Sequence, residues 1–237
     1  MKNNLYDTID TDLTHKQESI QVSYSNAKSV SLTATGPVTV EKIDDAAKLE
    51  SLRVSWSELL SNSEADNLFL TWEWLHTWWE HLRERHKLHV LVVRRASRLI
   101  AIAPFVVNPA QAKRLLPFRS VEFMGLSTVG TDYLDIIIRH GEEKATLDAL
   151  ITYLSDHRLM FELRRVKTGS TAASRLVSGL AERNWRVTSS VTEICPYIQF
   201  QGHSWESYLA SLGSSHRQNM RRCLRRIDKD FTSELIQ

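Results

Sequence analysis

The chain has 237 residues, 42% of them hydrophobic, and its 30 Lys and Arg residues nearly balance its 28 Asp and Glu residues. This length and composition predict a globular protein with a packed core. A formal net charge of +2 excludes the global field of a nucleic-acid or membrane binder, so any polyanion site must be local. The longest apolar stretch, Leu99 to Val107, is far shorter than the ~20 residues of a transmembrane helix.

The two cysteines, Cys195 and Cys223, match neither a disulfide framework nor the clustered spacing of a zinc site. We therefore expect a cytoplasmic location and no bound metal, with both cysteines buried as small apolar residues. Residues 1–36 are rich in Ser, Thr, Asn and Asp and contain no apolar core of a signal peptide. They are predicted to form a disordered polar tail.

Two helices are predicted after a short strand at 38–41. Asp44 or Asp45 can cap the first helix, which ends at the polar residues 61–67. Its apolar residues recur at steps of three and four: Leu49, Leu52, Trp56, Leu59 and Leu60.

Thr71 can cap the second helix, whose aromatic stripe we interpret as a core face rather than a ligand-stacking face. The stripe consists of Trp72, Leu75, Trp78, Trp79 and Leu82. His76, His81 and His86 are five residues apart, which scatters their rings around a helix and argues against a metal site.

The rest of the first 200 residues alternates between strands and helices. The segments 88–93 and 99–107 should pair as an antiparallel hairpin, with Pro104 marking a bulge or an edge because proline donates no hydrogen bond. Strands are also expected at 120–124, 133–139, 160–165, 185–190 and 194–200, and helices at 141–155 and 171–183. This order predicts the α/β class, with a mixed sheet flanked by helices on both faces.

Two helices follow, from Ser204 and over 215–229, and the second is strongly basic. Arg217, Arg221 and Arg225 lie four residues apart on one line, and Arg222, Arg226 and Lys229 lie beside them. Such guanidinium groups can grip the phosphate of a nucleotide, a tRNA or a lipid head group. The alternative is a solvated or intramolecularly paired face.

Two further segments carry candidate chemistry. Arg139 and Gly141 lie where a strand leads into a helix N-terminus, a position at which backbone amides can bind pyrophosphate. The next two residues are glutamates, which favour stabilisation of the helix dipole instead. Asp132, Tyr133 and Asp135 can supply an acid and a base, or act as a turn cap and an edge-strand residue.

Four segments, in their order and spacing, carry a resemblance to a known family: 69–79, 131–135, 193–197 and 205–226. Over about Val38 to Asp230 the chain resembles the bacterial GNAT-superfamily acetyltransferases often labelled cellulose-biosynthesis-like, which are related to the Fem-type peptidyltransferases. The resemblance implies two GNAT-like lobes in tandem. Residues 37–200 would form the first lobe, and residues 201–237 the first helices of an incomplete second lobe.

The resemblance also implies a function. An acyl group would pass from acetyl-CoA, the co-substrate, to a small-molecule or carrier-linked amine in polysaccharide or cell-envelope biosynthesis. The segment from Arg139 to Ala145 occupies roughly the place of the superfamily's pyrophosphate loop but lacks its second glycine. We therefore expect an accessory first lobe, and a chain that lacks the complete catalytic lobe and is inactive alone. The rival function is a non-catalytic module that docks an anionic carrier through the basic helix, the one place where nucleic acid is expected to bind.

Overall fold

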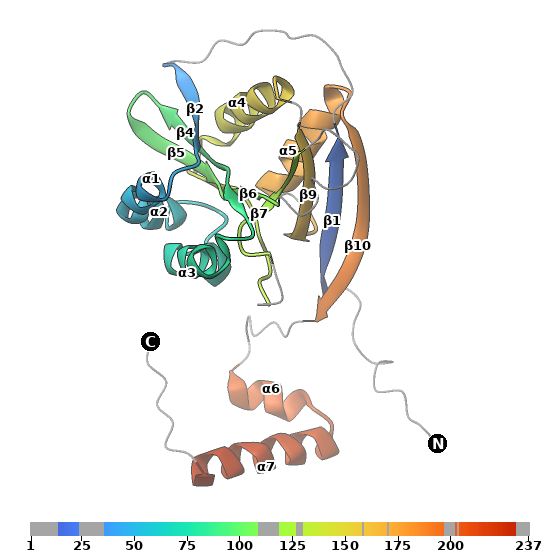
Figure 1. Ribbon diagram of the computed structural model, residues 1–237. Coiled ribbons are helices and arrows are strands. Elements are labelled where there is room, and N and C mark those ends of the chain that lie inside the picture. The colour runs from blue at the N-terminus through green and yellow to red at the C-terminus, as the bar shows by residue number, and fades with distance from the viewer. Residues whose placement is uncertain are drawn as a thin grey trace. The chain divides into compact units, whose positions relative to one another are not determined.

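The computed structural model describes residues 14–23, 36–108, 119–126, 130–157, 159–169, 171–196, 202 and 204–230, with the backbone alone for 14–23, 119 and 196. The chain divides into two compact units, one from His15 to Cys195 and one that contains the helices after Pro196. In the first unit, helices α1 to α3 lie on one side of the strands and α4 and α5 on the other (Figure 1). The predicted α/β class with mixed sheets is confirmed.

Strand β2 (Val38–Ile43) leads into two helices where one was predicted, α1 (Ala46–Ser51) and α2 (Arg53–Leu60). The helix breaks because the Leu52 amide donates to the Leu49 carbonyl, three residues back, which tightens the last turn of α1. Asp45 is the predicted cap, and its side chain accepts a hydrogen bond from the Lys48 amide.

The predicted aromatic helix is α3 (Trp72–Leu82), which follows the short 3-10 helix η2 (Leu68–Leu70). Thr71 caps α3 through its hydroxyl, as expected. Four of the five stripe residues, Trp72, Leu75, Trp78 and Trp79, are buried and Leu82 is partly buried, which confirms the interpretation as a core face.

The two long segments of the hairpin each switch between sheets. One is β3 (Lys87–Leu88) and β4 (Val90–Arg95), and the other is β5 (Arg98–Ala103) and β6 (Phe105–Val107). The interruption in the second falls at Pro104, as predicted, because this residue cannot donate to the ladder. Its carbonyl still accepts a hydrogen bond of 2.7 Å from the Met124 amide.

The sheets have the orders β10-β1-β9-β7-β6-β3 and β2-β4-β5-β8. Strand β7 (Arg119–Phe123) runs parallel to β9 (Leu159–Lys167), whereas the other described pairs are antiparallel. Of the predicted strand 133–139, only β8 (Ile137–Ile138) forms regular ladder structure.

The second half of the unit contains α4 (Glu143–Ser155), α5 (Ala172–Glu182) and β10 (Arg186–Pro196). The prediction of separate strands at 185–190 and 194–200 is wrong for the described residues, because one continuous strand runs from Arg186 to Pro196; residues 197–200 lie outside the described ranges. The side chains from Thr188 to Ile194 are exposed, so a polar sequence is compatible with this outer strand.

Strand β1 (Thr14–Ser23) lies in the segment that was predicted to be disordered, so that prediction is wrong for these ten residues. The strand pairs antiparallel with β9 and lies between β9 and β10 in the sheet order. Backbone hydrogen bonds to neighbouring strands can order a polar segment, and composition alone does not reveal such neighbours.

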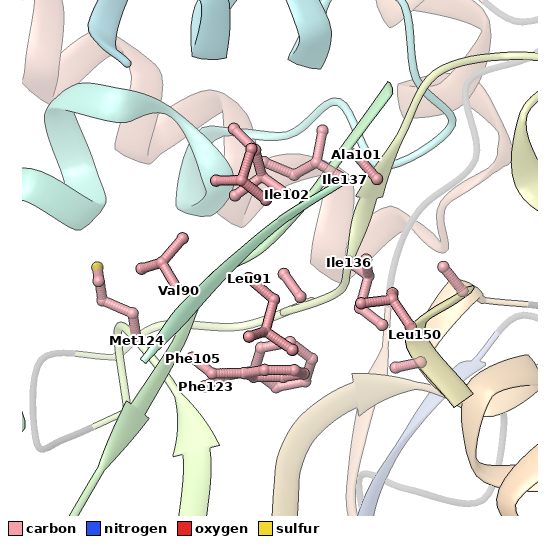
Figure 2. Packing of buried hydrophobic residues seen from close by; sticks show 14 of the residues in the cluster. Val90, Leu91, Ala101, Ile102, Phe105, Phe123, Met124, Ile136, Ile137 and Leu150 are labelled. Atoms are coloured by element: carbon pink, nitrogen blue, oxygen red, sulfur yellow. The ribbon is translucent and has the colours of Figure 1, made fainter. Parts of the chain in front are cut away.

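Strands β4 and β5 form the centre of the core and are buried along almost their full length. Helix α2 packs on β5, and α4 packs on β2 and β4, so both faces of this sheet are covered. Its strands therefore need no alternation of apolar and polar side chains. Figure 2 shows part of this cluster, including Leu91 from β4, Ile102 from β5 and Leu150 from α4. The ring centroids of Phe105 and Phe123 are 5.2 Å apart.

The second unit contains α6 (Trp205–Ser211) and α7 (Ser214–Asp230), close to the predicted helices. Ser204 caps α6 by accepting from the Ser207 amide. Cys223 is exposed on α7 and Cys195 is only partly buried, so the prediction of two buried cysteines is wrong. No described helix combines the length and the apolar composition required to cross a membrane.

Candidate functional site

The segment from Thr131 to Ile136 connects β7 in one sheet to β8 in the other. It contains the two predicted carboxylates, Asp132 and Asp135, and directs them to different partners. Where it crosses β9, the Leu134 amide donates to the Arg165 carbonyl at 2.9 Å. Tyr133 and Arg165 have φ angles of 54° and 63°, in the left-handed region that residues other than glycine seldom adopt. This turn directs Asp132 toward Arg165 and Asp135 toward the start of α5.

Asp132 belongs to an ion-pair cluster at the ends of β9 and β10. Arg165 pairs with Asp132 at 3.4 Å and also with Glu193, and each of these side chains is about one-third or more exposed. Partly exposed pairs of this kind contribute little to stability. The pairing of Asp132 with Arg165 and of Arg165 with Glu193 could not be predicted from the sequence, because these residues lie on segments that are distant along the chain.

Tyr133 is a poor candidate for a base at neutral pH. Burial raises the pKa of its phenol, and the neighbouring Cys195 and Asp132 raise it further. The phenol therefore retains its proton. The predicted acid–base pair is not assembled here, since the Asp135 carboxylate is bound elsewhere.

Asp135 caps α5 from a distance of 37 residues along the chain. One carboxylate oxygen accepts from the amides of Ile136 and Ala173 at 2.8 and 2.7 Å, and the other accepts from Ala172 at 3.1 Å. Ala172 and Ala173 are the first two residues of α5, where amides are not used within the helix. The carboxylate therefore occupies the helix end that would attract an anionic ligand.

Burial raises the pKa of Asp135 to about 6, against the effect of the three amide hydrogen bonds and Arg175, which favour the charged form. The surrounding cavity has a volume of about 20 Å3, roughly enough for one water molecule. Its lining also includes Glu64 and Glu143.

The turn before α4 contains the two cofactor-site candidates, Arg139 and Gly141, and its amides are likewise in use. Each amide from Arg139 to Glu142 donates to a protein oxygen. The acceptors are, in chain order, the Ile100 carbonyl, the Asn62 carbonyl, a Glu143 carboxylate oxygen and the Arg139 carbonyl. Gly141 has a φ of 82°, in the left-handed region that glycine adopts without strain. This backbone conformation explains why a glycine occupies the turn.

The Arg139 side chain is 7% exposed and points into the protein. Its guanidinium group donates to both carboxylate oxygens of Glu58, at 2.9 and 2.6 Å, and to the Leu99 carbonyl at 3.3 Å. This bidentate pair joins α2 to the end of β8 and lowers the pKa of Glu58. Glu142, the residue before α4, is paired with Arg95 at 2.7 Å.

A second buried carboxylate, Glu122 on β7, was missed by the sequence analysis and is 2% exposed. His86 Nε2 lies 3.2 Å from Glu122, and His86 Nδ1 lies 3.3 Å from the Leu82 carbonyl. Both ring nitrogens therefore face oxygen acceptors. Arg164 approaches the other Glu122 oxygen at 3.8 Å.

The other two predicted histidines point to separate partners, Glu50 for His76 and the Thr77 carbonyl for His81. Within the described ranges, no group of three His, Cys, Asp or Glu side chains is arranged to hold a metal ion.

The four anion-binding candidates Arg217, Arg221, Arg222 and Arg225 all lie on α7 and are exposed or partly exposed. Arg222 donates to the Asn219 side chain at 2.8 Å, and Arg225 donates to the Arg221 carbonyl at 3.3 Å. No described residue of α7 is buried, and Arg217 is partly exposed.

No family model matches the chain, and no curated protein or solved structure is similar to it at a significant level.

Proposed function

We propose that residues 37–200 form the accessory lobe of a cytoplasmic, acetyl-CoA-dependent N-acyltransferase of the GNAT superfamily, and that α6 and α7 begin a second lobe of the same kind. The acceptor would be a small-molecule or carrier-linked amine of polysaccharide or cell-envelope biosynthesis. The family assignment rests on the resemblance of the four sequence segments. The element order, with β7 and β9 parallel and α4 between β8 and β9, is compatible with it.

The accessory role rests on the start of α5 and on the turn before α4, where protein oxygens accept hydrogen bonds from the backbone amides. A pyrophosphate group needs free amides, and here Asp135 binds the first two of α5 while the turn from Arg139 to Glu142 is internally bonded. Glu143 adds negative charge at the start of α4, and the cavity at Asp135 is far smaller than the several hundred Å3 typical of cofactor pockets. These residues do not fit acetyl-CoA, so we derive no catalytic step in this lobe.

Calorimetric titration of acetyl-CoA into the folded full chain tests this proposal. We expect no heat beyond dilution, and no transfer of labelled acetyl groups to amines by the purified chain. Micromolar binding would contradict the accessory role, and acetyl transfer would place a catalytic centre in this chain.

A second function is supported by the arginines of α7, which can bind an anionic carrier without chemistry. Retention of the full chain on heparin that falls steeply with salt, and weakens in Arg221→Ala/Arg225→Ala, is expected from this function. A salt-independent profile would contradict it.

A further inference from the structure

Helix α7 exposes a narrow apolar stripe beside its line of arginines. Met220, Leu224 and Ile227 follow one another at steps of four and three, and are 37%, 37% and 45% exposed. On α6, Trp205 is 38% exposed. Apolar side chains at helical spacing that remain in contact with water mark a surface that a partner covers.

The cationic side chains of α7 fall on two different faces. Three residues turn a helix by about 300°, so Arg221 lies about 60° from Leu224 and directly borders the apolar stripe. Arg217 and Arg225 continue this border at steps of four, about 20° and 100° from Leu224, and Asp228 lies among them at about 40°. Arg222 lies about 160° from Leu224, on the opposite face.

The two faces also differ in their local partners. On the opposite face, Arg222 donates to Asn219 and Arg226 pairs with Asp230 at 3.4 Å. Among the described residues, none of the bordering arginines, Arg217, Arg221 and Arg225, forms an ion pair with a carboxylate. The ion pair that neutralises a cation of α7 among the described residues is therefore on the opposite face, whereas the bordering arginines keep their positive charge next to the apolar stripe.

We infer that α7 docks the chain on an anionic lipid surface, with the apolar stripe in the outer part of the acyl layer and the bordering arginines on lipid phosphates. A basic helix with one apolar face and low overall hydrophobicity is suited to lie in a membrane interface. Exposed Trp205 fits the same environment, since indole rings favour the head-group region. RNA would use the arginines but would leave the aliphatic stripe in water, because bases stack on aromatic rings.

This inference rests on the proposed anion binding by α7 and names the anion. Flotation of the full chain with vesicles tests it, using phosphatidylcholine alone and an equal mixture of phosphatidylcholine and phosphatidylglycerol. We expect binding to the anionic vesicles only. The double variant Arg221→Gln/Arg225→Gln should reduce the partition coefficient roughly thirtyfold, at about 1 kcal/mol for each cation near the surface.

Two matched variants separate docking from nonspecific attraction. Arg222→Gln/Arg226→Gln removes the same charge from the opposite face. Its reduction of the partition coefficient should be several-fold smaller than that caused by Arg221→Gln/Arg225→Gln. Leu224→Ser/Ile227→Ser leaves the charge unchanged and should also abolish most of the binding. Circular dichroism on each variant confirms that the helices remain folded.

The outcomes distinguish lipid docking from anion binding in general. Equal losses in both arginine variants, or full binding by Leu224→Ser/Ile227→Ser, would overturn the inference that one face of α7 docks on the lipid surface. Binding to heparin or RNA without binding to anionic vesicles would overturn the lipid assignment and leave anion binding intact. Failure to bind heparin, RNA and vesicles would overturn both the lipid docking and the anion binding by α7.

Discussion

Replacement of Asp135 by asparagine should reveal how strongly this carboxylate holds α5. The side chain accepts three backbone hydrogen bonds, from Ile136, Ala172 and Ala173. The asparagine side chain would keep the oxygen that serves Ile136 and Ala173, but its amino group would face the Ala172 amide. One buried donor would then lack an acceptor, which by itself costs about 1–3 kcal/mol in the free energy of unfolding, while the loss of the buried charge opposes this cost near pH 7.

The pH dependence gives a sharper test, because burial raises the pKa of Asp135 to about 6 while an unfolded aspartate titrates near 3.9. Between these values the folded state holds a proton that the unfolded state releases. This contribution is fully present below pH ~4 and is lost as the pH rises through about 6. The loss amounts to roughly 3 kcal/mol, at about 1.4 kcal/mol for each unit of pKa difference.

Urea unfolding at a series of pH values measures this contribution. The wild-type profile minus that of Asp135→Asn removes the effects of the other titrating groups that the two chains share. We expect the difference to change by about 3 kcal/mol between pH 4 and 7, with the wild type losing stability relative to the variant as the pH rises. A difference of the opposite slope would show that the amides and the start of α5 keep the carboxylate charged, and would refute the reasoning.

Three further changes test the packing of the first unit. Gly179→Ala in α5 should destabilise the protein by about 1–2 kcal/mol, because the added Cβ would lie 2.3 Å from Cδ1 of Ile151 on α4; Ile151→Val removes that methyl group and should restore most of the loss in a double-mutant cycle. Glu58→Ala should cost about 3 kcal/mol and Arg139→Met about 1 kcal/mol, because only the first leaves a buried charge unpaired; equal costs in chemical denaturation would contradict this asymmetry. Trp56→Phe should cost about 2 kcal/mol, since it removes both core volume and the 2.9 Å hydrogen bond to the Leu70 carbonyl; a melting temperature equal to that of the wild type would contradict it.

Features set by neighbouring residues could be predicted from the sequence. Asp45 and Thr71 cap helices through amides three residues ahead, and Pro104 interrupts its own strand. The burial of the α3 stripe likewise follows from helical periodicity. Each of these depends on a physical constraint that acts within about one turn or one strand.

Features that depend on distant partners could not be predicted. Strand β1 is ordered by pairing with β9, more than one hundred residues later in the chain, and nothing in its composition indicates that partner. Glu122 appears as one charged residue in a strand, and its burial is explained only by His86 and Arg164. The partners of α7 are a different case, because its exposed stripe indicates that a partner exists without identifying it.

Asp135 shows why the candidate site was only half predictable. The motif around it was recognised as able to supply a carboxylate, but the competing use of that carboxylate depends on Ala172 and Ala173, whose side chains carry no chemical signal. The same helix end cannot serve both a protein carboxylate and a cofactor phosphate, since each needs the same amide protons. Weakening the internal contact is therefore the direct way to test the exclusion. Asp135→Ala would free two amides of α5 and lower the stability of the unit, and any affinity for inorganic phosphate that appears in this variant but not in the wild type would identify the carboxylate as the competing anion.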